Sequence, residues 1–274
     1  MSAAAPPRRR RPRRLLLHLS AALLALWVLV PLYMITVTAF VPRDAVFDYP
    51  KRFVPEQWSA DTMAFFVNSA GVLPALRNSV VVALLTLLLS TAIGAPAGYA
   101  LSRYRFRGRG LYRLAILSTR AFPVVILSIP LAVTFFQIGI YDTVWAVALM
   151  HTALALPFTV LITSSVFISV PPEYEEAAKV YGCTPLSAFV RVVLPQALPG
   201  LAAAGIFTFV LSWNEIFAAV ILTLQERTLP ALVVSVLTQS PLPFRFAAAW
   251  FMFAPAIVVI YVIRRYLLGL WGAD

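Results

Sequence analysis

Residues 170–185 read VPPEYEEAAKVYGCTP, a polar stretch between two long apolar runs. The prolines at 171 and 172 suit the first turn of a helix, and the glutamates that follow lie at the positive end of its dipole. Gly182 fits the position just past the helix end, where a left-handed backbone is needed. Thr184 and Pro185 then favour the start of a second helix. The stretch therefore predicts a small helical knob outside the apolar runs.

Within the first helix of this knob, one stripe combines aromatic and small side chains. Tyr174, Ala177, Ala178 and Tyr181 follow the spacing i, i+3, i+4 and i+7. In the second helix, we expect Pro195 and Pro199 to end or kink the chain before the next apolar run.

The apolar runs on both sides of the knob indicate a membrane protein. Of the 274 residues, 61% are hydrophobic and only 12% are charged, too apolar a balance for a soluble domain. Six runs reach the roughly 20 residues that a spanning helix needs. We predict an all-α integral membrane protein with an irregular outer segment at 41–74 and transmembrane helices at about 15–40, 75–101, 112–137, 143–168, 199–224 and 246–268.

The basic residues predict the orientation. A net charge of +11 would also suit nucleic acid, but these residues cluster at the ends of apolar runs, which favours the positive-inside rule and no nucleic-acid partner. We expect both termini to be cytoplasmic, with a basic tail at 1–14 and a transmembrane domain at 15–274. The predicted inside set is Arg8, Arg9, Arg10, Arg11, Arg13, Arg14, Arg103, Arg105, Arg107, Arg109, Arg113, Lys179, Arg191, Arg264 and Arg265.

An arginine-rich start before Leu15–Val30 also resembles a signal peptide, including a twin-arginine signal at Arg13-Arg14. The apolar run, however, continues past the usual length of about 7 to 15 residues, and no small-residue cleavage site follows it. We therefore expect an uncleaved membrane anchor.

Enzyme and metal chemistry find little support in the residues. Cys183 is the single cysteine, and His18 and His151 have no Cys or carboxylate cluster beside them, so no metal site is expected. Neither lysine follows the glycine-rich loop of a Walker A motif, and no G-x-S-x-G motif of a serine hydrolase occurs. The prediction is a membrane protein with no nucleotide, metal or catalytic site of its own.

Two charges fall inside predicted spans. Arg120 and Glu215 should face protein or water, because lipid exposure costs roughly 2.5 to 3.5 kcal/mol each. One interpretation is that they line a polar path through the membrane with Trp213 and Asn214, whose ring and amide could contact a solute there. Arg120–Glu215 pairing across different heights, and an interfacial role for Trp213, stay open as alternatives. His151 is expected to be a satisfied interhelical residue rather than a proton relay.

The knob carries a recognisable pattern. Glu176-Ala177-Ala178, three residues, Gly182, nine residues and Val192-Val193-Leu194-Pro195 resemble the EAA loop of ABC importer permeases, here residues 170–199. Val192 replaces the usual Ile, and Tyr181 stands where Asp is frequent. In that family, the loop is a coupling helix seated in a groove of the ATPase subunit. The resemblance implies this docking role for Glu176, Ala177, Ala178, Tyr181, Gly182, Leu194 and Pro195.

Outside the loop, the chain resembles the carbohydrate-uptake branch, the maltose-type second permease. The matching motifs are Arg77-Asn78-Ser79, residues 98–108, Phe122-Pro123, Ile129-Pro130-Leu131, residues 139–143, Leu156-Pro157-Phe158, Trp213-Asn214-Glu215, Thr228-Leu229-Pro230 and Gly269-Leu270, whereas residues 271–274 depart from the usual basic tail. The resemblance implies a type I importer permease fold in the bacterial inner membrane, forming half of a sugar pathway.

The same resemblance implies three protein partners. They are a second permease that completes a heterodimer, a dimer of ATP-binding subunits that binds ATP and Mg, and an extracytoplasmic solute-binding protein. Glycerol-phosphate or another polyol is the alternative substrate. A proton-coupled secondary transporter is a weaker alternative, because Glu215 is the one acid well inside a predicted span.

Overall fold

The computed structural model describes the backbone of residues 11–270 and the side chains of residues 16–262. Every regular element in this part of the chain is helical, as the composition predicts. The elements are α1 (Arg11–Ala39), η1 (Ala45–Phe47), α2 (Asp61–Val67), α3 (Val72–Arg103), α4 (Arg109–Ser118), η2 (Thr119–Ala121), α5 (Val124–Gln137), α6 (Val144–Ser169), α7 (Pro172–Val180), α8 (Pro185–Ala188), η3 (Phe189–Val193), α9 (Leu194–Asn214), α10 (Phe217–Leu222), α11 (Leu229–Val236) and α12 (Leu242–Leu270).

Within the described residues, five helical stretches are long and apolar enough to cross a bilayer: Leu16–Ala39, Val72–Arg103, Val144–Ser169, Pro185–Asn214 and Leu242–Val262. A sixth crossing exists if the bent pair Arg109–Ala121 and Val124–Gln137 counts as one span. These stretches correspond to the six predicted apolar runs, although two of the runs are not continuous helices.

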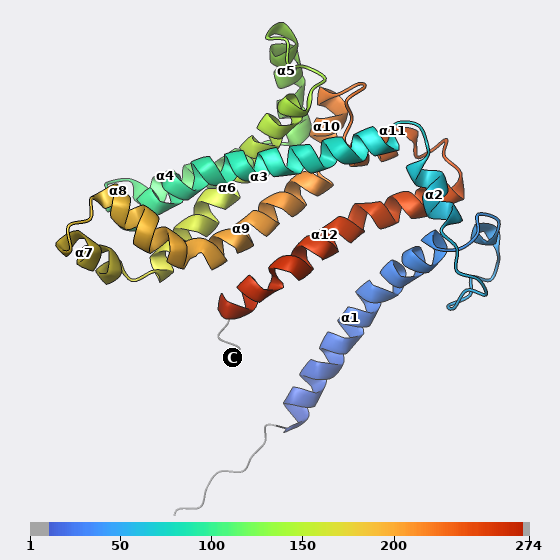
Figure 1. Cartoon of the computed structure of the whole chain (residues 1–274), viewed down its shortest axis with the longest axis horizontal. Coiled ribbons are helices and arrows are strands. Elements are labelled where there is room, and N and C mark those ends of the chain that lie inside the picture. The colour runs from blue at the N-terminus through green and yellow to red at the C-terminus, as the bar shows by residue number, and fades with distance from the viewer. Residues whose placement is uncertain (1–10, 271–274) are drawn as a thin grey trace, which may run out of the picture. The chain divides into compact units, whose positions relative to one another are not determined.

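The third run, predicted as one helix over 112–137, breaks into two segments that meet at 84°. The break falls at Phe122 and Pro123, both with extended backbones, at ψ 125° and 132°. Proline lacks an N–H and disfavours helical geometry in the residue before it, so α4 and η2 end there and α5 begins with a new direction. Figure 1 shows α5 standing away from α3 and α6.

The fifth run, predicted over 199–224, also differs. Its helix starts earlier, ends at Asn214, and resumes at Phe217 as the six-residue α10. Pro195 and Pro199 were expected to end or kink the chain ahead of it, but they lie within α9. A π-helical turn, η3, precedes them, and the Leu194 N–H donates to the Phe189 carbonyl there. Because proline at 195 has no N–H to offer, it suits the first turn after this widened segment.

Two compact units group the described residues: one takes in the chain up to Val67 with Pro241–Trp250, and the other takes in Asn68–Ser240 with the chain from Phe251. In the first unit, the segment after α1 is more ordered than the predicted irregular cap, because it contains η1 and α2. The hydroxyl of Thr62 donates to the carbonyl of Val41 at 2.8 Å, and the rings of Phe66 and Phe244 meet at 4.9 Å.

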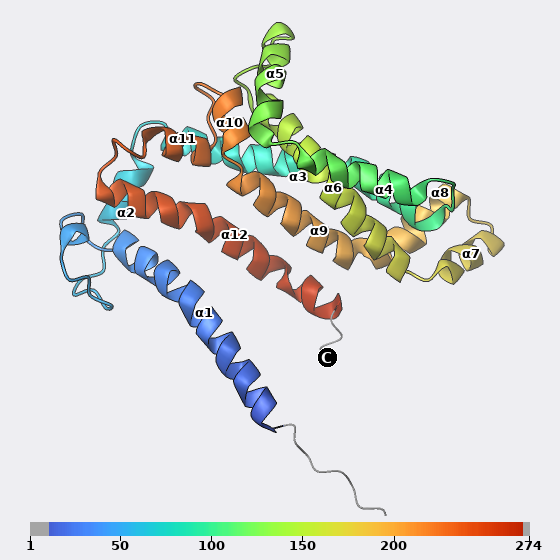
Figure 2. The same ribbon diagram turned by 180° about the vertical axis from the view of Figure 1, so that it is seen from behind.

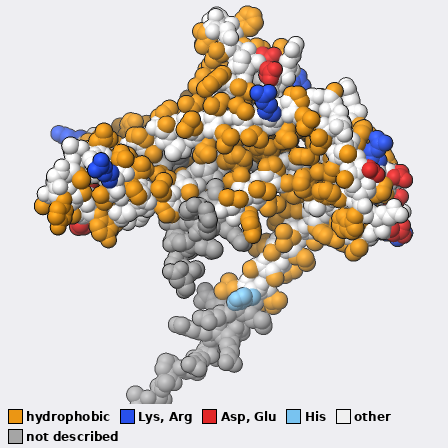
Figure 3. Space-filling model, in the orientation of Figure 1, with side chains coloured by type: hydrophobic (Ala, Val, Ile, Leu, Met, Phe, Trp, Pro, Cys, Tyr) orange, Lys and Arg blue, Asp and Glu red, His pale blue; other side chains and the backbone are white. Residues whose placement is uncertain are grey.

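The second unit is built on α3, α6 and α9, which lie side by side (Figures 1 and 2). Glycines allow the close approach of α3 to α6: a Cβ on Gly98 would meet the Ser164 nitrogen at 2.7 Å and the Val160 carbonyl oxygen at 2.9 Å. Apolar side chains cover most of the face drawn in Figure 3. That surface is expected of helices whose outer solvent is lipid.

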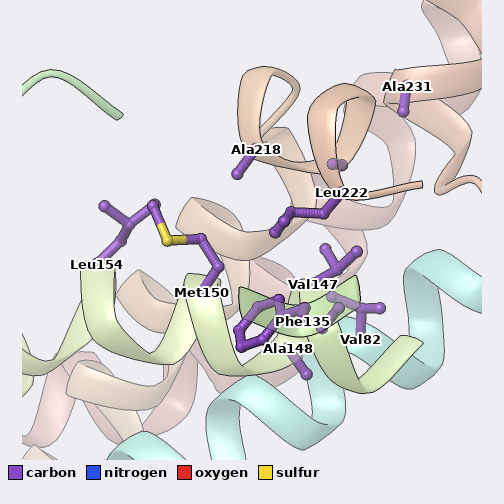
Figure 4. Packing of buried hydrophobic residues seen from close by; sticks show 11 residues of the cluster. Val82, Phe135, Val147, Ala148, Met150, Leu154, Ala218, Leu222 and Ala231 are labelled. Atoms are coloured by element: carbon purple, nitrogen blue, oxygen red, sulfur yellow. The ribbon is translucent and has the colours of Figure 1, made fainter. Parts of the chain in front are cut away.

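An apolar cluster holds α10 against the centre of this unit. Leu222 and Ala218 of α10 pack with Met150 and Val147 of α6 and with Phe135 of α5 (Figure 4). The short helix α10 thus packs against both α5 and α6. This packing positions α10 next to the buried polar residues described below.

Candidate functional site

The knob has the helix–turn–helix form that its sequence predicts. Gly182 has φ +89°, its N–H donates to the Lys179 carbonyl at 3.0 Å, and the next N–H donates to the Ala178 carbonyl at 3.0 Å. This pair of bonds is a Schellman motif, which closes α7. The Thr184 hydroxyl accepts the Ser187 N–H at 3.2 Å and caps α8. The predicted positive φ at Gly182 is confirmed.

Glu175 ties the knob to the transmembrane helices. Its carboxylate is buried and accepts the Tyr99 hydroxyl at 2.8 Å, the Arg103 Nε at 3.2 Å and the Lys179 Nζ at 2.8 Å. A further bond runs from Arg103 Nη2 to the Val170 carbonyl at 3.0 Å. Both Tyr99 and Arg103 belong to the end of α3, so the first helix of the knob is anchored on the end of a long span.

Opposing effects act on the pKa of the Glu175 carboxyl. Burial alone would raise this pKa, but the hydrogen bonds from Lys179 and Tyr99 and the charges of Lys179 and Arg103 outweigh burial and hold it below its usual value of 4.5. The carboxylate is therefore charged at neutral pH. Sequence reasoning placed Glu175 only at the positive end of a helix, although its i, i+4 spacing to Lys179 was a readable signal of pairing.

Aromatic packing stiffens the base of the knob. The Tyr99 ring lies 4.6 Å from the Phe189 ring and 5.5 Å from the Phe167 ring, measured between centroids. Phe189 belongs to η3 and Phe167 is fully buried at the end of α6. The end of α6 and η3, which flank the knob, thus both pack against the Tyr99 ring, and this packing holds the base of the knob against α3.

The tip of the knob, by contrast, is uncovered. Val180, Tyr181 and Leu186 are 87%, 90% and 73% exposed. Of the residues predicted to couple to an ATPase, Glu176, Ala177, Tyr181, Gly182 and Pro195 are exposed, and Ala178 and Leu194 are half-buried. An exposed apolar tip on a rigid base is a form suited to insertion into a groove on another protein.

Buried polar side chains gather where the fifth run breaks. His151, fully buried on α6, has its Nδ1 at 2.9 Å from the Ser212 hydroxyl and its Nε2 at 3.0 Å from the Glu215 carboxylate. The Ser212 hydroxyl donates to the Thr86 hydroxyl of α3 at 3.3 Å. The expected interhelical role of His151 agrees with these contacts, which join α3, α6 and α9.

Glu215 lies at the break between α9 and α10. Its backbone is extended, with ψ 127°, and its carboxylate accepts the N–H groups of Ala218 at 3.0 Å and Ala219 at 3.3 Å. These donors have no partner inside a new helix, so a nearby carboxylate satisfies them. Glu215 was predicted to line a substrate path; in this geometry, its side chain faces protein and fixes the break.

The other three predicted path residues differ in access. Trp213 is 1% exposed and donates its Nε1 hydrogen to the Met252 carbonyl at 2.9 Å, so its ring is covered by other residues of this chain. Asn214 is exposed and donates to the Val210 carbonyl at 2.9 Å. Arg120, the middle residue of η2, is exposed and donates to the Leu154 carbonyl at 2.8 Å.

Arg120 also lines a cleft of about 670 Å³ between α3, α4, α5 and α6. Its guanidinium carbon lies 4.7 Å from the centre of the Phe158 ring, a cation–π contact. Most of the cleft lining is apolar, and Thr119, Thr134 and Tyr112 supply its other polar side chains. Arg120 and Glu215 each have other partners here, so the alternative of direct pairing is not observed.

Asp142 is a residue that sequence reasoning missed. It has φ +58°, and one carboxylate oxygen accepts the N–H groups of Leu224 at 2.7 Å, Gln225 at 3.0 Å and Glu226 at 3.0 Å. Asp tolerates a left-handed backbone better than most residues do. The contact joins the loop before α6 to the loop after α10. Its partners lie more than eighty residues away along the chain, and no local pattern pointed to them.

Comparison with known proteins agrees with the resemblance at the knob. Residues 90–268 match the family described as binding-protein-dependent transport system inner membrane component. The chain belongs to this family of ABC transporter permeases. The diacetylchitobiose uptake system permease protein NgcG of Streptomyces coelicolor is 33% identical over 76% of this chain and 70% of its own length. The trehalose transport system permease protein SugB of Mycobacterium tuberculosis is 30% identical over 87% and 89%.

A solved structure supports the fold of this permease. A bacterial ABC transporter involved in the import of the acidic polysaccharide alginate superposes with a TM-score of 0.72, covering 96% of this chain and 99% of its own, at 20% identity. The predicted type I importer permease fold is thereby confirmed, with its two broken spans as corrections. The permease is an inner membrane component of a transport system.

Proposed function

We propose that this ABC importer permease receives the motion of a separate ATPase dimer through its knob and forms half of a sugar pathway with a second permease. The observation that carries the docking role is the exposed tip, Val180, Tyr181 and Leu186, on a base anchored by Glu175. A force applied at this tip is transmitted to α3 through Tyr99 and Arg103, because the anchor leaves α7 little freedom to move alone.

Gly182 supplies the test. A Cβ on Gly182 would meet no atom within 4 Å. A substitution there therefore adds no steric clash with other residues, and its cost is the backbone strain of a side chain at φ +89°. Gly182→Val forces a β-branched residue into this region, at a strain of about 1 to 3 kcal/mol, whereas Gly182→Asn tolerates it. We expect the Val variant to insert and pair with the second permease but to lose ATPase co-elution and uptake, and the Asn variant to retain both. Full co-elution and normal uptake in the Val variant contradict the proposed coupling role.

For the substrate, a sugar is supported by the names of two relatives, which specify diacetylchitobiose uptake and trehalose transport, and polyol phosphates are the competing class. Arg120 and Asn214 are the two predicted path residues whose side chains are accessible. A binding screen of the cognate solute-binding protein against sugars and polyol phosphates decides between the classes. The ligand found in this screen is then used to measure uptake by a transporter that carries Arg120→Leu. Normal uptake would show that Arg120 does not line the substrate path.

A further inference from the structure

Four arginines surround the start of α4 without a carboxylate partner. Arg105, Arg107, Arg109 and Arg113, here called the arginine cluster, lie within one turn and the first helical residues after α3. None of them belongs to an ion pair in the described part of the chain, where the neighbouring Arg103 is paired with Glu175. No acidic residue occurs in the sequence between Asp61 and Asp142, so the local chain offers no neutralising charge.

The geometry of this turn concentrates the charge. Gly108, at φ +88°, reverses the chain, and the Phe106 ring folds back to 6.4 Å from the Tyr112 ring on α4. Arg109 and Arg113 are one helical turn apart on one face, where like charges repel unless an anion joins them. The Nε atoms of both are buried without a hydrogen-bond partner among the described residues, and Arg113 Nη2 reaches only the Ser164 hydroxyl at 3.3 Å.

The start of α4 adds donors of its own. Gly108 precedes the helix without a side-chain cap, and the Arg109 N–H donates to the Phe106 carbonyl at 3.3 Å. The next N–H groups, those of Gly110 and Leu111, are therefore the ones directed toward the same turn. Beyond this end the helix is apolar and uncovered: Leu111, Leu114 and Leu117 are 71%, 59% and 46% exposed. One short helix therefore presents cationic donors at its start and lipid-compatible side chains along its length.

We propose that the arginine cluster and the start of α4 bind the phosphate of an anionic phospholipid in the inner leaflet. The apolar side chains of α4 then lie against the acyl chains. Arginine suits this ligand because its planar guanidinium bonds phosphate oxygens in pairs. The proposal relies on the cytoplasmic placement predicted from the basic residues, and it is independent of which substrate the importer carries.

The test compares lipid retention by the complete transporter. The complex is reconstituted in nanodiscs of phosphatidylcholine with phosphatidylglycerol, extracted gently, and its retained phosphatidylglycerol is quantified by native mass spectrometry. A hydrogen bond between charged groups at a specific site contributes about 1.5 kcal/mol or more, which is more than a tenfold change in retention for each arginine that bonds the phosphate. We expect Arg109→Gln with Arg113→Gln to lower retention by more than tenfold and the matching Lys substitutions to lower it less. Arg191→Gln, which removes an exposed charge on the same side, should leave retention unchanged.

Three outcomes overturn the proposal. They are unchanged retention in the Gln pair, an equal loss in Arg191→Gln, and displacement of the lipid by inorganic phosphate, which would assign the site to a soluble anion. Co-elution of all subunits is monitored in each variant, and the Lys pair covers the case in which the Gln pair does not assemble.

Discussion

At Gly98, the helix α3 lies close against the backbone of α6. Its missing side chain leaves room for Thr163, whose hydroxyl donates to the Gly94 carbonyl at 3.0 Å. A Cβ at Gly98 would collide with that hydroxyl and with the backbone of Val160 and Ser164. Backbone atoms of a packed helix cannot rotate away, so the two spans would have to separate.

Gly98→Ala is therefore expected to destabilise the assembled permease by about 1 to 3 kcal/mol, the usual cost of overpacking. Thermal unfolding of the purified complex measures this effect. Gly110→Ala is the matched control, because a Cβ there meets nothing within 4 Å, and helix propensity makes it neutral or slightly stabilising. Equal unfolding temperatures for Gly98→Ala and wild type would show that α3 and α6 are not packed at this distance.

Glu175 gives the knob a pH dependence of defined sign. The folded pKa lies below the unfolded value of 4.5, so its contribution to stability is complete above pH 4.5 and is lost as pH falls through the folded pKa. Glu175→Gln removes the titrating group and leaves Arg103 with a weaker partner. At neutral pH we expect a loss of about 1.5 to 3 kcal/mol, the value of hydrogen bonds to charged groups.

The measurement is the difference in unfolding temperature between wild type and Glu175→Gln as a function of pH. That difference should shrink as the pH falls below 4.5. Glu176→Gln serves as a control, because Glu176 is an exposed neighbour on the same helix. A difference that stays constant with pH would mean that the Glu175 charge does not hold the knob.

At the scale of single elements, sequence patterns predict some helices closely and miss others for physical reasons. The fourth run, predicted at 143–168, is α6 at Val144–Ser169, because no charged residue interrupts it and Thr143 caps its start by accepting the Ala146 N–H at 3.3 Å. Proline alone did not indicate which spans break. Pro123 starts a new helix, whereas Pro96, Pro130 and Pro157 lie inside continuous ones.

The candidate site, too, could be predicted from the sequence only in part. Local signals were sufficient for the knob, since the proline pair, the glycine and the threonine cap act on neighbouring residues. The break at Glu215 depends on His151, and the bonds of Asp142 depend on a loop more than eighty residues away. Such contacts follow from tertiary packing, which one sequence does not reveal.

The break between α9 and α10 should depend on the His151–Glu215 contact. Glu215→Ala leaves the Ala218 and Ala219 N–H groups and the His151 ring without their acceptor, and His151→Ala removes the link to α6. Because the two side chains share one hydrogen bond, a double-mutant cycle on unfolding free energy should give a coupling of about 0.6 to 1.7 kcal/mol, the range for polar contacts between membrane helices. If the losses of unfolding free energy are strictly additive, the His151–Glu215 contact does not stabilise the break.

For the whole molecule, orientation in the membrane is the property that the charges predict and that the fold alone leaves open. The positive-inside rule places the turn after α3 in the cytoplasm and the segment after α1 outside. The predicted basic tail at 1–14 and the final residues 271–274 bear on the same question, but most of the tail and all of the final residues lie outside the described part of the chain.

Two exposed tyrosines allow the orientation to be tested. Tyr49 in the segment after α1 is 96% exposed, and Tyr104 in the turn after α3 is 62% exposed. In a Cys183→Ser background, each is replaced by cysteine and treated with a membrane-impermeant maleimide. Tyr49→Cys should be labelled in intact spheroplasts, because the segment after α1 carries acids that balance its bases. Tyr104→Cys should be labelled only after permeabilisation, because the positive-inside rule keeps each residue of the arginine cluster in the cytoplasm. Labelling of Tyr104→Cys in intact spheroplasts would invert the topology, and it would place both the knob and the proposed lipid site on the wrong side of the membrane.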